Sequence, residues 1–469
     1  MNASMNAAWQ KLTLRNGAPQ SWILSSYLHR LVGLLASWQQ GSLLMRWSEG
    51  LATTVAAILF FLAPFVSTTL IGILMMACGA FWVLLTLSDE GRPGITPMHL
   101  AVFVYLAIAF LSTALSPVKM AALDGLIILT LNIVVFLLLA RVLRSPTLRS
   151  TLITVYLMTT AVVSTMGMRQ WFFGADALAT WVDVDSNLAG TTRVYSSLGN
   201  PNLLAGYLIA ACMLSAAAVF AWKRWLPKAL AVVLVLLNSA CLVLTFSRGG
   251  WIGYVGGGFV FLLLLVHWFS KYLPRFWRRL AIPFVLGISA AFVVAAVVAV
   301  DPVRDRVLSI FAGREDSSNN FRLNVWAAVR EMIAARPVLG IGPGNEAFNQ
   351  IYPRFQRTGF TALSAYSVFL EILVETGVIG LMVFLWLLSV TLSLGWRRLQ
   401  EMRQAGDRDG FWLLGALASM MGMLTHGLVD TVWYRPQIST LWWLMLAIVA
   451  SYYLFPNRST REVEDGSTE

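Results

Sequence analysis

Long apolar stretches separated by short polar connections dominate the chain. A helix that crosses the hydrocarbon core of a bilayer needs about 20 mostly apolar residues. Stretches of this length predict twelve spanning helices and therefore an all-α polytopic membrane protein. The predicted helices begin near Ser48, Ser67, Pro97, Met120, Ser150, Pro201, Leu226, Gly250, Leu280, Ser367, Phe411 and Gln437.

The composition supports a membrane location and argues against several other classes. Of the 469 residues, 58% are hydrophobic and only 12% are charged, whereas a soluble domain carries about 25% charged residues. The three cysteines all lie in apolar stretches, so we expect neither a disulfide framework nor a metal site. The net charge of +11 indicates membrane topology rather than nucleic-acid binding. No cofactor and no nucleic-acid partner are expected.

Basic residues in the short connections set the expected orientation. With a cytoplasmic N-terminus, the cytoplasmic segments hold 21 of the 34 lysines and arginines. We therefore predict an integral protein of the inner or plasma membrane with both termini in the cytoplasm. The short outer segments hold only Lys119, Arg169, Arg193, Arg248 and Arg435.

The same pattern divides the chain into five parts. Near the N-terminus, the stretch from Trp22 to Trp47 mixes apolar and basic residues and fits a helix at the cytoplasmic interface. The parts are a cytoplasmic N-terminal segment 1–47, spanning helices one to nine within 48–300, a large extracytoplasmic loop 301–366, spanning helices ten to twelve within 367–455, and a cytoplasmic tail 456–469.

The large loop is expected to contain short helices. A helical period extends from Phe321 to Arg336, with Asn319 or Asn320 as the expected N-cap. Its arginines share an arc with its apolar residues, which predicts a helix that lies on the membrane or covers a cavity. The turn sequence GIGPGN then leads to a second short helix, predicted over Glu346 to Arg357. The arginines of the first helix are Arg322, Arg330 and Arg336.

Arginines at the outer ends of the predicted helices form a candidate anion site. Arg248 stands in the sequence TFSRGGW between two apolar stretches, and an arginine near hydrocarbon usually faces protein or water. Guanidinium groups match carboxylate and phosphate oxygens two at a time. For Asn200 and Asn202 the alternative is a structural role in a turn or a helix cap. The candidate anion-binding residues are Arg193, Arg248, Arg322, Arg435, Asn200, Asn202 and Tyr366.

The alternative for each arginine is a structural ion pair on the same face. This alternative is weakest for Arg248, whose flanks are nearly uncharged. The glycines that follow it, Gly249 and Gly250, let backbone or a ligand approach closely, so we expect its side chain to face a polar cavity rather than lipid. The acidic candidates for pairing are Asp183, Asp185, Glu315, Asp316 and Asp430.

Two pairs of titratable residues at helical spacing suggest a proton or cation relay inside the membrane. Glu371 and Glu375 lie one turn apart in the tenth predicted span. His426 and Asp430 have the same spacing in the eleventh. The alternative for the glutamates is that one or both pair with a neighbouring arginine near the outer end.

Several segments together resemble the O-antigen ligase and polymerase superfamily of membrane proteins. They are GNPN (Gly199 to Asn202), TFSRGGW (Thr245 to Trp251), PVLGIGPGN (Pro337 to Asn345) and YSVFLEILVETGVIG (Tyr366 to Gly380). The resemblance covers roughly residues 150–400 and implies glycan transfer from a polyprenyl-pyrophosphate donor. Ligases of that superfamily carry a histidine, the expected base, where this chain has Tyr366. An unperturbed tyrosine, with a pKa of about 10, is a poor base at neutral pH.

A second resemblance extends over nearly the whole chain. It is to the cyanobacterial inorganic-carbon accumulation family, whose members are named as bicarbonate transporters. This resemblance implies that the outer arginines bind bicarbonate and that the protein moves it inward or supports that process. We take this as the expected function, with a glycosyltransferase acting on a polyprenyl-linked glycan as the alternative. The matching segments are SYLHRLVG (Ser26 to Gly33), ATWVD (Ala179 to Asp183), FAGREDSSNNFRLNVW (Phe311 to Trp326), FTALSAYS (Phe360 to Ser367) and GLVDTVWYRP (Gly427 to Pro436).

Overall fold

The computed structural model describes most of the chain as helices. Within the described ranges no strand is present. Part of the predicted interfacial stretch near the N-terminus, Asp183, Asp185 and the predicted tail lie outside the described residues. The described ranges are 3–14, 32–42, 45–88, 95–174, 193–299, 301–311 and 313–454.

Helices are present where the apolar stretches predict them. In the described part of the chain, α5 to α11 and α16 are the eight helices long and apolar enough to cross a membrane, while α4, α17 and α18 are apolar but shorter. The all-helical membrane fold is therefore confirmed, whereas the count of twelve spans and their orientation stay predictions. The bundle helices are α4 (Ser48–Leu62), α5 (Thr68–Leu87), α6 (Pro97–Ala114), α7 (Lys119–Val142), α8 (Pro146–Phe173), α9 (Pro201–Ala221), α10 (Trp225–Leu244), α11 (Arg248–Phe269), α12 (Arg275–Ala299), α16 (Val368–Ala405), α17 (Gly410–His426) and α18 (Pro436–Ser451).

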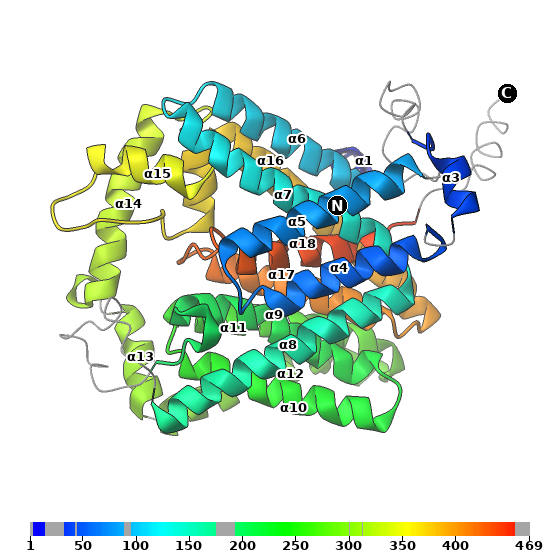
Figure 1. Ribbon diagram of the computed structural model, residues 1–469. Helices are drawn as coiled ribbons and strands as arrows, with labels where there is room; N and C mark the ends of the chain where they lie inside the picture. Colours follow the sequence, from blue (N-terminus) through cyan, green and yellow to red (C-terminus); the bar gives the residue numbers. More distant parts are fainter. Residues whose placement is uncertain are drawn as a thin grey trace.

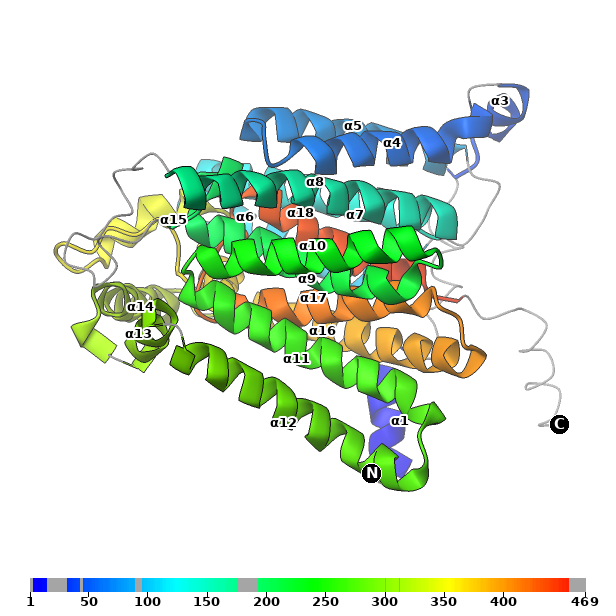
Figure 2. The same ribbon diagram turned by 90° about the horizontal axis from the view of Figure 1, so that it is seen from below.

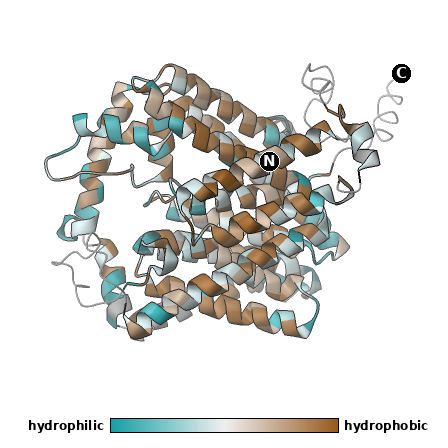
Figure 3. Ribbon diagram, viewed as in Figure 1, coloured by the Kyte–Doolittle hydropathy of each residue, from teal (hydrophilic) through white to brown (hydrophobic). Residues whose placement is uncertain are grey.

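These helices lie side by side in one bundle (Figures 1 and 2). The central helices α9, α17 and α18 are buried along almost their whole length. Apolar residues cover much of the bundle in Figure 3, and outer helices such as α10 and α12 expose large apolar side chains. Such a surface suits contact with lipid, because hydrocarbon offers no hydrogen-bond partners to polar groups.

Three short helices gather at one end of the bundle, at the left of Figure 1. They are α13 (Asp301–Phe311), α14 (Ser317–Ala335) and α15 (Asn345–Ile351). The helices α1 (Ala3–Leu12) and α3 (Ala36–Gly41) lie toward the opposite end (Figures 1 and 2). We call the end that carries α13 to α15 the loop end. The side of the membrane that it faces stays a prediction.

Glycines let α11 pack closely against the two central helices beside it. A Cβ atom on Gly250 would lie 2.4 Å from the Cβ of Ala205 in α9. A Cβ atom on Gly253 would lie 2.8 Å from the Cβ of His426 in α17. Larger residues would push α11 outward, so these glycines bring its first residue, Arg248, into the interior of the loop end.

The segment before α15 is attached to a break in α16. Gly377 has φ 67° and ψ −170°, and a Cβ atom there would lie 2.1 Å from the carbonyl oxygen of Val338. The break allows the backbone N–H of Ile341 to donate to the carbonyl of Val374 at 2.9 Å. The sequence PVLGIGPGN is thus anchored to α16 by backbone hydrogen bonds.

The start of α14 differs from the prediction. Its N-cap is Asp316, whose Oδ1 accepts a hydrogen bond from the backbone N–H of Asn319 at 2.8 Å. The prediction of Asn319 or Asn320 is therefore wrong. The helix begins earlier because the Asp316 carboxylate is also fixed by Arg248, a contact between distant parts of the chain.

The second short helix of the loop is shorter than predicted. Instead of continuing to Arg357, α15 is followed by the 3-10 turn η6 (Tyr352–Arg354). Pro353 lies within that turn. Proline lacks the backbone N–H that a continuing α-helix requires.

Candidate functional site

Arg248 is buried at the loop end and points into the protein. Only 5% of the residue is exposed. Its Nη2 donates to the Asp316 carboxylate at 2.7 Å, and its Nη1 donates to the carbonyl and hydroxyl oxygens of Ser309 at 2.9 and 3.1 Å. The side chain therefore faces protein rather than lipid. The ion pair departs from the expectation based on its uncharged flanks, because the partner comes from the distant loop.

Three further arginines lie around Arg248. The Nε of Arg193 donates to the carbonyl of Thr245 at 3.0 Å, and the Nε of Arg306 donates to the carbonyl of Phe246 at 3.0 Å. Arg322 forms an ion pair of 3.4 Å with Asp430. We call these four residues the arginine cluster: Arg193, Arg248, Arg306 and Arg322.

The arginine cluster carries more positive than negative charge. Its four guanidinium groups face two carboxylates, Asp316 and Asp430. Burial, followed by the charges of Arg248 and then Arg322, lowers the pKa of Arg193 to about 10. Burial, followed by the charges of Arg248 and Arg193, lowers the pKa of Arg306 to about 9. With these pKa values Arg193 and Arg306 stay charged at neutral pH, and a bound anion would relieve the repulsion within the cluster.

The remaining candidate anion ligands have different positions. The Oδ1 of Asn202 accepts a hydrogen bond from Arg193 at 3.4 Å, which joins Asn202 to the cluster. Asn200 caps α9, because its Oδ1 accepts the backbone N–H of Asn202 at 2.8 Å. Arg435 is exposed at the start of α18 and its guanidinium lies 5.3 Å from the centre of the Tyr434 ring.

The other two arginines of the first loop helix do not enter the cluster. Arg330 and Arg336 are both exposed. Arg336 donates to the carbonyl of Leu115 at 2.9 Å, away from the cluster. Of the arc of arginines predicted on α14, Arg322 alone is turned toward Asp430.

Tyr366 is unsuited to act as a base. Its ring is half-buried and meets the Phe321 ring edge-on, with centroids 5.3 Å apart. Burial, and then the charge of Asp430, raises the pKa of Tyr366 above its usual value. The phenol therefore stays neutral at physiological pH, where it can donate a hydrogen bond but cannot accept a proton from a substrate hydroxyl.

His426 and Asp430 make different contacts. Asp430 accepts hydrogen bonds from Arg322 and from the backbone N–H of Thr431, and so belongs to the arginine cluster. His426 is 1% exposed and lies against α11, where its Nε2 is 3.3 Å from the position that a Cβ on Gly249 would take. This nitrogen has no hydrogen-bond partner in the described part of the chain.

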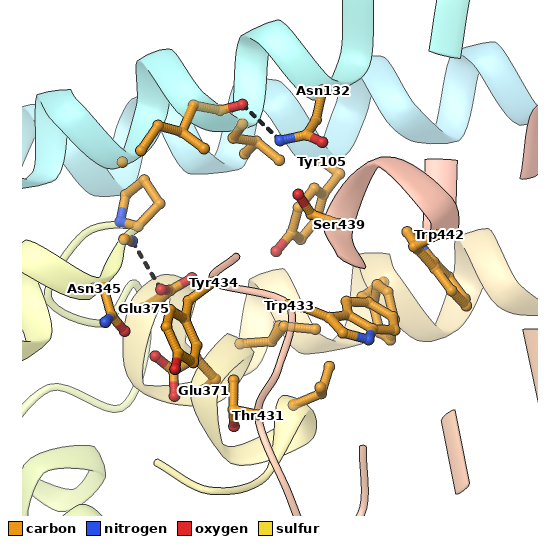
Figure 4. A pocket seen from close by; sticks show the side chains of 18 of the residues that line it. Tyr105, Asn132, Asn345, Glu371, Glu375, Thr431, Trp433, Tyr434, Ser439 and Trp442 are labelled. Carbon is orange, nitrogen blue, oxygen red and sulfur yellow. Dashed lines mark hydrogen bonds between the residues drawn. The ribbon is translucent and has the colours of Figure 1, made fainter. Parts of the chain in front are cut away.

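Glu371 and Glu375 accept backbone hydrogen bonds. The Oε2 of Glu371 accepts the N–H of Ala365 at 2.5 Å, and the Oε1 of Glu375 accepts the N–H of Gly344 at 2.8 Å. Across the described residues neither glutamate forms an ion pair with an arginine, so that alternative is not what the structure shows. Both line a cavity of about 180 Å³ between α7, α16 and α18 (Figure 4).

Residues 230–385 match the model of the O-antigen ligase family. The matched segment begins within α10, ends within α16 and covers about a third of the chain. The chain is thus a membrane protein with an O-antigen ligase-like domain. No curated protein matches the sequence. The resemblance to bicarbonate transporters is not confirmed by these comparisons and stays a prediction.

The ligase-like domain contains three of the four members of the arginine cluster. Arg248, Arg306 and Arg322 lie inside the matched segment, whereas Arg193 precedes it. Sequence reasoning did not single out Arg306 from the other arginines of the large loop. Its signal is weak, because only the folded position of α13 against Phe246 brings it into the cluster. In the described part of the chain, no group of three histidine, cysteine or acidic residues could hold a metal ion.

Proposed function

We propose that the arginine cluster binds the diphosphate of a polyprenyl-linked glycan and that the protein transfers this glycan to an acceptor hydroxyl. The excess of four guanidinium groups over two carboxylates carries the proposal. A diphosphate is multiply charged and presents several oxygens in different directions. Guanidinium groups from separate segments can therefore contact it at the same time.

The chemistry requires stabilisation of the leaving group above all. The bond between the anomeric carbon and the diphosphate oxygen breaks, and a bond between that carbon and the acceptor oxygen forms. The acceptor proton leaves with the diphosphate, so no oxidant or reductant is needed. The arginines stabilise the charge that develops on the leaving diphosphate.

The neutral phenol of Tyr366 does not supply general base catalysis. Such catalysis contributes typically 10²–10⁴-fold to a rate. We infer that the rate of transfer depends instead on stabilisation of the leaving group and on positioning of the two substrates. The phenol, near Arg322 and Asp430, is placed to donate a hydrogen bond to a bound oxyanion.

Bicarbonate binding is the second candidate, favoured by the resemblance that extends over nearly the whole chain. A planar oxyanion fits the fork of one guanidinium group. It needs far fewer positive charges than the cluster provides.

Binding measurements on the full-length protein in nanodiscs test the proposal. The probes are polyprenyl diphosphate, polyprenyl monophosphate and bicarbonate. We expect the diphosphate to bind most tightly, and Arg306→Gln or Arg193→Gln to weaken it about 10–100-fold, as expected for the loss of a hydrogen bond to a charged group. The matched control is Arg354→Gln, an exposed loop arginine outside the cluster.

Two results would contradict the proposal. One is equal affinity for monophosphate and diphosphate, because a monophosphate cannot use the whole cluster. The other is an equal loss in the Arg354→Gln control, which would indicate a nonspecific charge effect. Displacement of the diphosphate by millimolar bicarbonate, with uptake of bicarbonate into liposomes, would favour the second candidate.

A further inference from the structure

The cavity between α7, α16 and α18 presents hydrogen-bond acceptors that lack donors. Asn132 is 3% exposed, and its Nδ2 donates to the carbonyl of Ile128 at 2.9 Å, which leaves Oδ1 without a partner. The Oγ1 of Thr431, also 3% exposed, and the Oδ1 of Asn345 have no partner either. Each lines the cavity, as Figure 4 shows. Buried polar atoms without partners are rare in folded proteins and call for an explanation.

Two carboxylates add further acceptor capacity. Each of Glu371 and Glu375 uses one oxygen for a backbone N–H, and both line the cavity. None of the residues that line the cavity is basic. The cavity therefore suits a neutral ligand that donates several hydrogen bonds, and it offers no cationic group to an anion.

Aromatic rings form another wall of the same cavity. The ring centroids of Trp433 and Trp442 lie 4.4 Å apart, and Phe384 lies 6.0 Å from Trp442. All three line the cavity. Indole faces carry negative charge density and attract groups with a positive edge, such as polarised C–H bonds.

The size of the cavity suits one ring. The cavity measures about 180 Å³, and a cavity of about 150 Å³ is known to hold benzene. A six-membered ring with hydroxyl substituents fits this space. It would direct O–H donors at the acceptors and a C–H face at the indoles.

We propose that this cavity binds one pyranose ring of a sugar. The aromatic wall offers no ligands to a lone metal cation, and the described residues contain no group of three histidine, cysteine or acidic side chains that could hold one. An acyl chain would leave every acceptor unpaired. That the sugar ring belongs to a polyprenyl-linked glycan rests on the proposed function, whereas the sugar subsite rests on the cavity alone.

Saturation-transfer NMR with the full-length protein in nanodiscs tests the subsite, with D-glucose and N-acetyl-D-glucosamine as probes. A ligand of this size is expected to bind with a Kd on the order of 1 mM. The variants are Asn132→Leu, which removes the unpartnered amide at similar volume, and Trp433→Leu, which removes one indole. Each is expected to weaken sugar binding about tenfold.

The controls separate this inference from loss of fold and from the proposed function. Trp225→Leu replaces a tryptophan that is 77% exposed at the start of α10 and should leave sugar binding unchanged. Asn132→Leu should keep or raise the melting temperature, because it removes a buried unsatisfied group. Arg193→Gln should weaken polyprenyl diphosphate binding and leave monosaccharide binding intact.

The outcomes are distinct. Absence of sugar binding up to about 100 times the expected Kd, or sugar binding unaffected by both cavity variants, would overturn the subsite. Sugar binding that is sensitive to the cavity variants supports it even if the diphosphate does not bind, which would refute the proposed function alone. If Asn132→Leu also weakens a polyprenyl diphosphate-linked sugar but not bare polyprenyl diphosphate, the ring comes from the lipid-linked glycan. If it weakens the free sugars alone, the subsite takes a free sugar.

Discussion

Replacing Tyr366 with phenylalanine distinguishes a hydrogen-bonding role from a catalytic one. The change removes the hydroxyl group and keeps the ring that meets Phe321 edge-on. Even with an ordinary pKa of about 10, only about 0.1% of the phenol would be ionised at pH 7. Burial and Asp430 raise the pKa of Tyr366 further. The variant therefore loses at most one neutral hydrogen bond, worth about 0.5–1.5 kcal/mol or up to roughly tenfold in affinity.

The assay is the release of polyprenyl diphosphate from a polyprenyl-linked glycan by the full-length protein in nanodiscs. We expect Tyr366→Phe to retain at least about a tenth of the wild-type rate at neutral pH, by the hydrogen-bond estimate above. Arg306→Gln, measured in parallel, should lose more because it removes charge from the proposed leaving-group site. A loss of about a thousandfold for Tyr366→Phe with diphosphate binding intact would show that the hydroxyl acts as a base, and our reasoning on Tyr366 would be refuted.

Three further predictions concern stability. Arg149 is 3% exposed and forms an ion pair with Asp409 at the end opposite the loop end, so Arg149→Met should lower the free energy of unfolding by about 3–5 kcal/mol. Arg397→Gln, in an exposed ion pair, should lower it by about 1 kcal/mol or less. Thermal unfolding in detergent compares the two variants. Gly344→Ala places a Cβ 2.5 Å from the backbone of α7 at φ 103° and should destabilise by more than about 2 kcal/mol, while Gly72→Ala meets open space and should not destabilise. Burial raises the pKa of Asp316, but the hydrogen bonds from Arg248 and from the backbone N–H of Asn319, together with the charges of Arg248 and Arg306, outweigh it, and the pKa lies below its usual value. The resulting stability is present above about pH 4 and is lost as the pH falls through the lower folded value. Proteolysis of the loop end should increase over that range in the wild type, and Asp316→Asn should lack this dependence.

The helices could be predicted from the sequence because a bilayer imposes length and polarity on each span. The apolar stretches located α5 to α11 and α16 to within a few residues. The break at Gly377 could not be predicted in this way, since a glycine within an apolar stretch does not by itself indicate that the helix is interrupted there. Its φ of 67° becomes necessary only when the carbonyl of Val338 approaches the same point.

The candidate site could be anticipated in part. Successive connections between spanning helices alternate between the two sides of the membrane, and this alternation placed Arg193, Arg248 and Arg322 at the same end of the bundle, although up to 129 positions separate them. The partners of these arginines were beyond sequence reasoning, because Asp316 reaches Arg248 only after α13 folds back over the start of α11. The cavity beside Glu375 could not be predicted either, since it depends on three helices that are distant in the sequence.

Backbone strain is gathered at the same end as the positive charge. At the loop end, three residues other than glycine have a positive φ: Ser196 with φ 52° at the start of the 3-10 helix η3 (Ser196–Leu198), Phe246 with φ 50° just before α11, and Tyr366 with φ 51° just before α16. Each costs about 1–2 kcal/mol relative to an ordinary conformation, so the surrounding contacts must hold them. The hydroxyl of Ser196 donates to the carbonyl of Val163 at 2.6 Å, and the carbonyl of Phe246 accepts from Arg306.

This placement supports the proposal that the loop end carries the functional site. Strained turns of this kind cluster at active and ligand-binding sites, because they fix backbone groups that relaxed turns would aim elsewhere. Here the turn at Phe246 aims two consecutive carbonyls, those of Thr245 and Phe246, at Arg193 and Arg306. The two arginines are thereby held near Arg248 against their mutual repulsion. A relaxed turn would let them part, and the concentrated positive charge on which the proposed diphosphate site depends would be lost.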